Sequence, residues 1–270
     1  MFISGKEFDT NNKMYVMGIL NVTKDSFSDG GKYTTLDAQL KQVEKMIKEG
    51  ADIIDIGGES TRPGYIPVSA EDEIAVTCPI IEKVKTEFDI TISLDTTKAS
   101  VAEEGLKAGG HIINDVWGLK KDDKIADVIK KYDATTIIMH NRKEALYQDL
   151  FEGICQDLEE SLQIAGNASI PKEKIILDPG IGFGKDTPMC LKTIDFMPRL
   201  IERFDYPWLM AASRKSVIGN TLNLPVDDRL EGTLAITARA FMDGCSFVRV
   251  HDVLPNKRLI DMLSAIKNAI

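Results

Sequence analysis

The chain has 270 residues, of which 43% are hydrophobic and 28% charged, and these proportions exclude collagen-like, low-complexity and disordered proteins. The formal net charge of −9 argues against a nucleic-acid or anionic-membrane binder, but it allows an anionic small molecule in a locally basic pocket. No apolar segment has the length of a membrane helix or the form of a signal peptide. The four cysteines form no CxxC pair, which favours free thiols in a reducing compartment. We therefore expect a soluble, cytoplasmic protein.

Apolar segments of strand length alternate along the chain with longer segments of helical periodicity. In the first helical segment, Leu36, Leu40, Val43 and Ile47 share one face, while lysines and glutamates take the other. In chain order, strands and helices are predicted alternately over 14–20, 36–49, 52–56, 70–88, 90–94, 100–108, 112–114, 123–132, 135–139, 150–165, 174–177, 188–204, 208–212, 230–243, 247–250 and 255–270.

These segments form eight strand–helix units of about 30 residues each, which predicts a (β/α)8 TIM barrel. No linker or change of composition divides the chain, so we predict a single domain over residues 1–270. A doubly wound open sheet is the alternative fold, because it is built from the same units. Gly50, Gly109 and Gly244 directly follow predicted helices, where glycine ends a helix in the left-handed conformation.

Polar or ionisable residues directly follow all eight predicted strands, at the end where barrel enzymes carry their active sites. From the first strand to the last, they include Asn21, Asp55, Asp95, Asn114, His140, Asp178, the segment 213–216, and Arg249 with His251. An Asp or Asn in such a place can also cap the next helix. The agreement of all eight strand ends favours a functional rim.

The residue types at this rim indicate a chemistry. Asp95, Asn114 and Asp178 would form a buried floor of hydrogen-bond acceptors, suited to a heterocycle with several N–H donors. A second group would form a cationic half-rim, suited to a phosphate or pyrophosphate leaving group. Its members are Arg62, Arg214, Lys215, Arg249 and His251.

Three further features belong to this end of the predicted barrel. The loops 24–33 and 59–67 are rich in polar residues and glycine, which is typical of covers that close over a substrate. The segment 178–185, DPGIGFGK, has the spacing of neither nucleotide-binding motif, so its glycines are expected to turn the backbone tightly beside a ligand. The histidines lack zinc-site spacing, whereas a magnesium ion on pyrophosphate needs only one or two protein oxygens, and Asn21 could supply one.

Eight segments resemble, in order and spacing, the signatures of the dihydropteroate synthase family. They are MGILNVTKDSFSDGG (17–31), ADIIDIGGESTRPG (51–64), ISLDTTK (92–98), IINDVWGL (112–119), ILDPGIGFGK (176–185), SRKSVIG (213–219), GTLAITA (232–238) and FVRVHDV (247–253). The resemblance implies a TIM-barrel transferase of folate biosynthesis and a sulfonamide target. It would join 6-hydroxymethyl-7,8-dihydropterin pyrophosphate to p-aminobenzoate, release pyrophosphate and use Mg²⁺. It also implies a homodimer formed through outer helices late in the chain.

The resemblance assigns residues to subsites by their position in these motifs. For the pterin ring they are Asp95, Asn114, Met139, Asp178, Phe183, Lys215 and Arg249. For p-aminobenzoate and sulfonamides they are Phe27, Thr61, Arg62, Pro63, Lys215 and Ser216. For pyrophosphate they are Asn21, Thr61, Arg249 and His251, with Asn21 also contacting the metal. The residues given catalytic roles are Asp29, Asp95, Lys215 and Arg249.

The family mechanism is dissociative. Pyrophosphate leaves first, and a pterin-methyl cation forms that Asp29 and Asp95 would stabilise by opposite charge. Lys24 stands where the family usually has proline, which should make the first loop more flexible. Two other functions stay open at this point: a methyltetrahydrofolate:corrinoid methyltransferase, whose barrel also binds a pterin, and a non-catalytic pterin-binding barrel.

Overall fold

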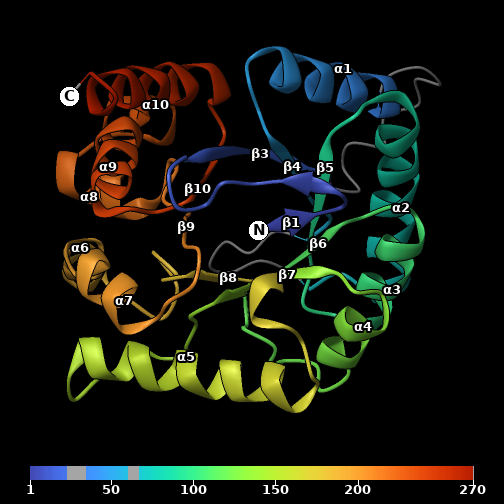
Figure 1. Cartoon of the computed structure of the whole chain (residues 1–270), viewed down its shortest axis with the longest axis horizontal. Helices are drawn as coiled ribbons and strands as arrows, with labels where there is room; N and C mark the ends of the chain where they lie inside the picture. The colour runs from blue at the N-terminus through green and yellow to red at the C-terminus, as the bar shows by residue number, and fades with distance from the viewer. Residues whose placement is uncertain (23–34, 60–66, 270) are drawn as a thin grey trace.

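The computed structural model describes residues 1–22, 35–59 and 67–269, in which parallel strands form a ring enclosed by helices (Figure 1). The strands are β3 (Tyr15–Asn21), β4 (Ile53–Gly57), β5 (Thr91–Asp95), β6 (Ile112–Asp115), β7 (Thr135–Met139), β8 (Ile175–Asp178), β9 (Leu209–Met210) and β10 (Phe247–Val250). Their order is β8-β7-β6-β5-β4-β3-β10-β9. A parallel bridge between Leu177 and Trp208 joins the two ends of this order. The predicted (β/α)8 barrel is thus confirmed, and the open sheet is excluded.

The helices surround the strands as predicted, with two differences. They are α1 (Thr35–Lys48), α2 (Ala70–Glu87), α3 (Ala99–Lys107), α4 (Ile125–Lys131), α5 (Leu150–Asn167), α6 (Thr187–Asp195), α7 (Met197–Arg203), α8 (Ser216–Leu222), α9 (Leu230–Asp243) and α10 (Val253–Lys267), with short 3₁₀ turns at Lys172–Lys174 and Val226–Asp228. No helix in the described part of the chain is both long and apolar enough to span a membrane.

The helix predicted over 188–204 is wrong as one element, because it divides at Phe196 into α6 and α7. Pro198 lies in the first turn of α7, where its missing N–H costs nothing, whereas inside one continuous helix it would remove a hydrogen bond. Helix α8 was not predicted. The predicted glycine stops are confirmed, with φ of 97° at Gly50, 113° at Gly109 and 96° at Gly244.

Side chains on each strand alternate between two cores. One set packs outward against the helices, as Ile54, Ile92 and Leu94 do. The other set points into the barrel and fills its lower half; it comprises Met17, Ile53, Ile112, Ile137, Ile176, Leu209 and Phe247. This packed layer leaves the polar ends of the same strands at the opposite, carboxyl-terminal mouth.

An antiparallel hairpin of β1 (Phe2–Ile3) and β2 (Lys6–Glu7) closes the bottom of the barrel, at the amino-terminal ends of the strands. Ile3 and Phe8 are buried in the same cluster as the inward-facing strand residues. The Phe8 ring lies 4.8 Å from that of Tyr15. No strand was predicted in this segment, which Figure 1 shows at the centre of the ring.

Candidate active site

The predicted acceptor floor lies at the mouth of the barrel, where strand register brings its members together. Asp95 ends β5 and pairs in register with Asn114 on β6, while Asp178 ends β8 and pairs with Met139 on β7. All four side chains are buried. Inward-facing strand ends therefore place two carboxylates, one amide and one thioether together at the mouth of the barrel.

Arg249 on β10 forms ion pairs with two carboxylates at this floor, Asp55 and Asp95. Its Nε lies 2.6 Å from Asp55 Oδ2, and its Nη2 lies 2.9 Å from Asp95 Oδ2. The Asn114 amide nitrogen donates to the Asp55 carboxylate, at 3.3 and 3.4 Å from its two oxygens. Burial raises the pKa of Asp95 to about 7, although the charge of Arg249 opposes that shift. One guanidinium thus pairs with two carboxylates, of which Asp55 is fully buried and Asp95 nearly so.

Lys215 lies on the other side of the floor, facing Asp178 and Phe183. Its Nζ donates to the carbonyl of Ile181 at 2.6 Å and lies 4.7 Å from the centre of the Phe183 ring. Burial lowers the pKa of Lys215 to about 8, and the charge of Asp178 partly offsets this effect. Burial likewise raises the pKa of Asp178, against the charge of Lys215. The structure thus brings a cation, a carboxylate and an aromatic ring to one place.

The glycine-rich segment after β8 turns tightly, as predicted. Gly180 has φ of 68°, and a Cβ there would meet the His140 carbonyl oxygen at 1.9 Å. The Asp178 carboxylate accepts the Gly180 N–H at 2.7 Å. Only glycine fits a left-handed position this close to another backbone segment, so the turn fixes the direction of Asp178.

A buried lysine that the sequence analysis missed supports this turn from below. Lys185 Nζ donates to His140 Nδ1 at 2.6 Å and to the carbonyls of Gly180 and Phe183. His140 Nε2 lies 2.9 Å from the Asp157 carboxylate, which also accepts from Arg142. Each group in this series of hydrogen bonds faces a complementary partner. The series therefore connects the end of β7 to the loop that carries Phe183. The signal was present, because a lysine directly follows the apolar and glycine-rich residues of the segment GIGFGK.

The predicted phosphate-side residues lie around the edge of the mouth. Asn21 is exposed at the end of β3, on the same face of the strand as inward-facing Met17. His251 is half-buried after β10, with Nδ1 3.0 Å from Ser213 Oγ. Ser216 is exposed at the start of α8, next to Lys215. The edge therefore carries polar groups from three separate strand ends.

Arg214 contributes less positive charge to this edge than the predicted half-rim supposed. Its guanidinium forms two hydrogen bonds with Asp252, at 2.9 and 2.6 Å. Five predicted residues lie outside the described residues, so nothing tests where they lie: Phe27, Asp29, Thr61, Arg62 and Pro63.

The two ends of the second long loop are tied together by charged groups. The Glu59 carboxylate accepts from the Val68 N–H at 2.9 Å and from Lys98 Nζ at 2.6 Å. Lys98 also pairs with buried Glu73 on α2. Burial is the largest single influence and would raise the pKa of Glu59, but the hydrogen bonds from Lys98 and Val68 and the charge of Lys98 together lower it. Glu59 and Val68, at the two ends of this loop, are therefore linked to each other and, through Glu59, to Lys98.

Asp55 is the other member of the site that received no role from the sequence. It is fully buried within β4 and accepts from both Arg249 and Asn114. The detectable signal was a lone carboxylate inside the otherwise apolar strand IIDIG. An ionised group is buried in such a strand only when a cation or several donors face it.

Comparison with known proteins gives a consistent result over nearly the whole chain. The model of a family described as pterin binding enzyme matches residues 17–251. The dihydropteroate synthase of Clostridium beijerinckii is 52% identical over 98% of this chain and 99% of its own length. That of Bacillus subtilis is 48% identical over 95% of this chain and 90% of its own length.

Solved structures agree with the sequence comparison. The dihydropteroate synthase of Clostridium difficile, crystallised in the presence of pteroic acid, superposes with a TM-score of 0.93 at 48% identity, covering 96% of this chain and 99% of its own. That of Yersinia pestis, in a sulfonamide drug complex, has a TM-score of 0.91 at 36% identity and covers 100% of this chain and 99% of its own. The chain therefore belongs to the pterin-binding enzymes and, among them, to the dihydropteroate synthases, transferases of folate biosynthesis.

Proposed function

We propose that the floor of the mouth binds the pterin ring of 6-hydroxymethyl-7,8-dihydropterin pyrophosphate. The observation that carries this proposal is the group of buried Asp95, Asn114 and Asp178 on one floor, with half-buried Lys215 beside Asp178. The amino and N–H groups of the ring are donors, which carboxylate and amide oxygens satisfy, and the ring carbonyl is an acceptor for Lys215. Met139 and Phe183 provide apolar contact with its faces, and the guanidinium of Arg249 stacks against the ring.

The proposed reaction exchanges one bond for another at the pterin methylene carbon. The bond from that carbon to the pyrophosphate oxygen breaks, and its electron pair leaves with pyrophosphate, which Asn21, Thr61, Arg249 and His251 bind. The amino nitrogen of p-aminobenzoate, held by Phe27, Thr61–Pro63, Lys215 and Ser216, then forms a bond to the carbon and loses a proton. The products are 7,8-dihydropteroate, pyrophosphate and one proton.

Positive charge on the methylene carbon is the feature that the protein must stabilise. Asp95 lies at the floor of the mouth, where burial weakens the screening of its charge by water. Asp29 belongs to the first long loop, and we propose that its carboxylate is the second group that opposes this charge. Two negative charges near the methylene carbon would lower the barrier to departure of pyrophosphate.

Replacing Asp29 with Ala should separate stabilisation of the cation from binding of the pterin substrate. We expect kcat to fall by about 10²-fold, because a charge that opposes the cation is lost, while the Kd for dihydropterin pyrophosphate changes little. Steady-state kinetics and calorimetry measure the two quantities. Asp37→Ala, an exposed change at the start of α1, is the control. Equal losses in kcat and affinity would contradict the cation-stabilising role.

The pH dependence follows from the two shifted groups on the floor. Burial raises the pKa of Asp95 to about 7, so its charge is present above that pH; burial lowers the pKa of Lys215 to about 8, so its charge is lost above that pH. We expect kcat/KM to rise towards about pH 7 and to fall above about pH 8. Asp95→Asn should remove the acidic limb and keep the alkaline one. If the acidic limb persists in that variant, the limb belongs to another group or to the substrate.

Magnesium enters this proposal as a partner of the pyrophosphate group. Asn21 presents an exposed amide oxygen at the mouth, and a hard oxygen ligand of this kind fits an ion that keeps most of its ligands as water and phosphate oxygens. Within the described ranges, no group of three or more carboxylate, histidine or cysteine side chains gathers as a metal site. When bound, Mg²⁺ would neutralise part of the charge on the leaving group, while Asn21 would hold it at the mouth.

We also propose that two copies associate through the late helices. Large apolar side chains are exposed on α8, α9 and α10, which lie together in Figure 1: Leu222, Met242, Met262 and Ile266. Light scattering after size-exclusion chromatography should give twice the mass of one chain. Met262→Glu should shift the mass towards that of one chain, and Leu146→Glu, an exposed change outside these helices, should not. A wild-type protein with the mass of one chain would contradict the dimer.

A further inference from the structure

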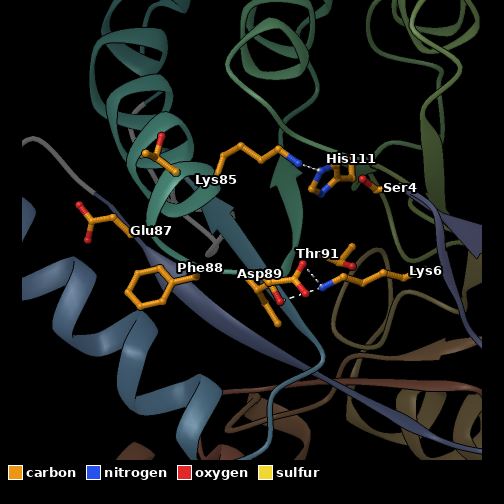
Figure 2. A pocket seen from close by; sticks show the side chains of 10 residues that line it. Ser4, Lys6, Lys85, Glu87, Phe88, Asp89, Thr91 and His111 are labelled. Carbon is orange, nitrogen blue, oxygen red and sulfur yellow. Dashed lines mark hydrogen bonds and ion pairs between the residues drawn. The ribbon is translucent and has the colours of Figure 1, made fainter.

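A polar pocket lies at the bottom of the barrel, at the end opposite the mouth (Figure 2). It has a volume of about 310 Å³ and lies between the N-terminal hairpin, the C-terminal end of α2 and the starts of β5 and β6. Its polar lining includes Ser4, Lys6, Lys85, Thr91 and His111. None of these residues takes part in the chemistry proposed for the mouth.

His111 and Lys85 face each other in this pocket with donors on both sides. The Ile92 N–H donates to His111 Nδ1 at 3.0 Å, while His111 Nε2 lies 3.2 Å from Lys85 Nζ. A neutral imidazole has one N–H, and the fixed backbone donor at Nδ1 places that proton on Nε2. An ammonium group has donors only. The N–H of His111 therefore points at a group that cannot accept it.

The two lysines of the pocket differ in their ion pairs. Lys6 is paired with Asp89, at 2.8 Å. Glu87, which also lines the pocket, lies 3.9 Å from Lys83, and in Figure 2 its carboxylate is directed away from Lys85. Among the described residues, no ion pair within 4.0 Å includes Lys85. A positive charge beside an N–H donor favours an anion.

The surroundings of the pocket orient the His111 ring and contact the stem of Lys85, whose side chain is exposed. The stem of Lys85 packs on Gly109, where an added Cβ would come within 2.8 Å of Lys85 Cγ. The ring of His111 is fixed by its bond from Ile92. Thr91, at the pocket wall, has a buried hydroxyl with no hydrogen-bond partner within the described part of the chain. A hydroxyl without a partner, an imidazole N–H and an ammonium group thus border the same pocket.

From these contacts we infer that the pocket at the bottom of the barrel binds a small oxyanion of the phosphate or sulfate type, between Lys85 Nζ and His111 Nε2. One oxygen accepts from the imidazole N–H, and the others accept from the ammonium group. The anion separates the two donors and gives each an acceptor. The site is independent of the condensation at the mouth.

His111 itself provides the readout. The chain has three histidines, so their imidazole signals can be resolved by nuclear magnetic resonance, with His111→Gln assigning the signal. Burial, with Lys85 and Lys6 nearby, lowers the pKa of His111 to about 4. Titration with inorganic phosphate should move the His111 signal and raise its pKa, because an anion favours the charged ring. The His251 signal reports separately on phosphate at the mouth.

Lys85→Met tests the cation, with Lys45→Met on α1 as an exposed control of equal charge change. We expect the apparent Kd for phosphate at His111 to rise at least about tenfold in Lys85→Met, as for one charged hydrogen bond, and to stay unchanged in Lys45→Met. The titration of the wild-type protein tests the proposal even if the Lys85→Met variant does not fold. The proposal fails if the His111 signal stays fixed when His251 is saturated, if chloride at equal ionic strength moves it as much, or if Lys85→Met responds like the wild type.

Discussion

Arg249→Ala should lower the free energy of unfolding by about 3–5 kcal/mol, the range for a buried ion pair that loses one partner. Asp55 is fully buried and Asp95 nearly so, and Arg249 lies within 3 Å of both carboxylates. Without it, two negative charges face each other away from water, and both must take up protons or repel each other. The midpoint of urea unfolding measures this loss.

Arg203→Ala is the matched control, because its pair with Glu159 is exposed to solvent on both sides. An exposed pair of this kind contributes about 1 kcal/mol or less. We further expect Arg249→Ala, studied where it is folded, to weaken binding of dihydropterin pyrophosphate by about 1.5–3 kcal/mol, the value of a charged hydrogen bond. Equal unfolding midpoints for the two variants would show that Arg249 does not hold the buried carboxylates together.

Asp178→Asn should raise the Kd for dihydropterin pyrophosphate by about 10²-fold. The substitution replaces one acceptor oxygen with an NH₂ donor, which would face the donor groups of the pterin ring. A loss of about 3 kcal/mol corresponds to this factor, and it combines a lost charged hydrogen bond with an opposed pair of donors. Calorimetric titration with the pterin substrate measures it.

The fold should survive that substitution, because the Asn side chain keeps an oxygen for the Gly180 N–H. Asp186→Asn is the matched control eight residues along the chain, where the side chain caps α6 by accepting the Met189 N–H and Asn caps equally well. Equal affinity in Asp178→Asn and Asp186→Asn would remove Asp178 from the pterin floor.

Much of the fold could be predicted from local patterns, because these patterns reflect physical necessity. Strands buried on both faces must be apolar for most of their length, and helices against them must carry one apolar face. The positions of Gly50, Gly109 and Gly244 followed from the left-handed conformation that ends a helix. The N-terminal hairpin lacked such a signal, because its strands have only two residues each and are held by long-range packing of Ile3 and Phe8.

The floor of the site was equally predictable, since parallel register brings successive strand ends to one mouth. Asp95, Asn114 and Asp178 meet there as the sequence indicated. Side-chain direction was not predictable in the same way. Arg214 and Lys215 are neighbours in the chain, yet Arg214 has φ of 56° and pairs with Asp252, while Lys215 reaches the carbonyl of Ile181.

Partners distant in sequence explain the residues that were missed. Asp55 gains its cation from a residue 194 positions away, and Lys185 gains its acceptors from a histidine 45 positions away. No short motif shows such a pairing. The donor conflict at His111 also depends on tertiary contacts, with Lys85 from α2 and Ile92 from β5.

The most direct test of the central claim is a joint assay of pyrophosphate and 7,8-dihydropteroate, with dihydropterin pyrophosphate and Mg²⁺ present, and with or without p-aminobenzoate. We expect the wild type and Asp186→Asn to form both products in equal amounts only when p-aminobenzoate is added, and Asp178→Asn to form far less of both at the same substrate concentrations. Pterin binding without either product, or full activity in Asp178→Asn, would contradict the proposal that this floor carries out the condensation.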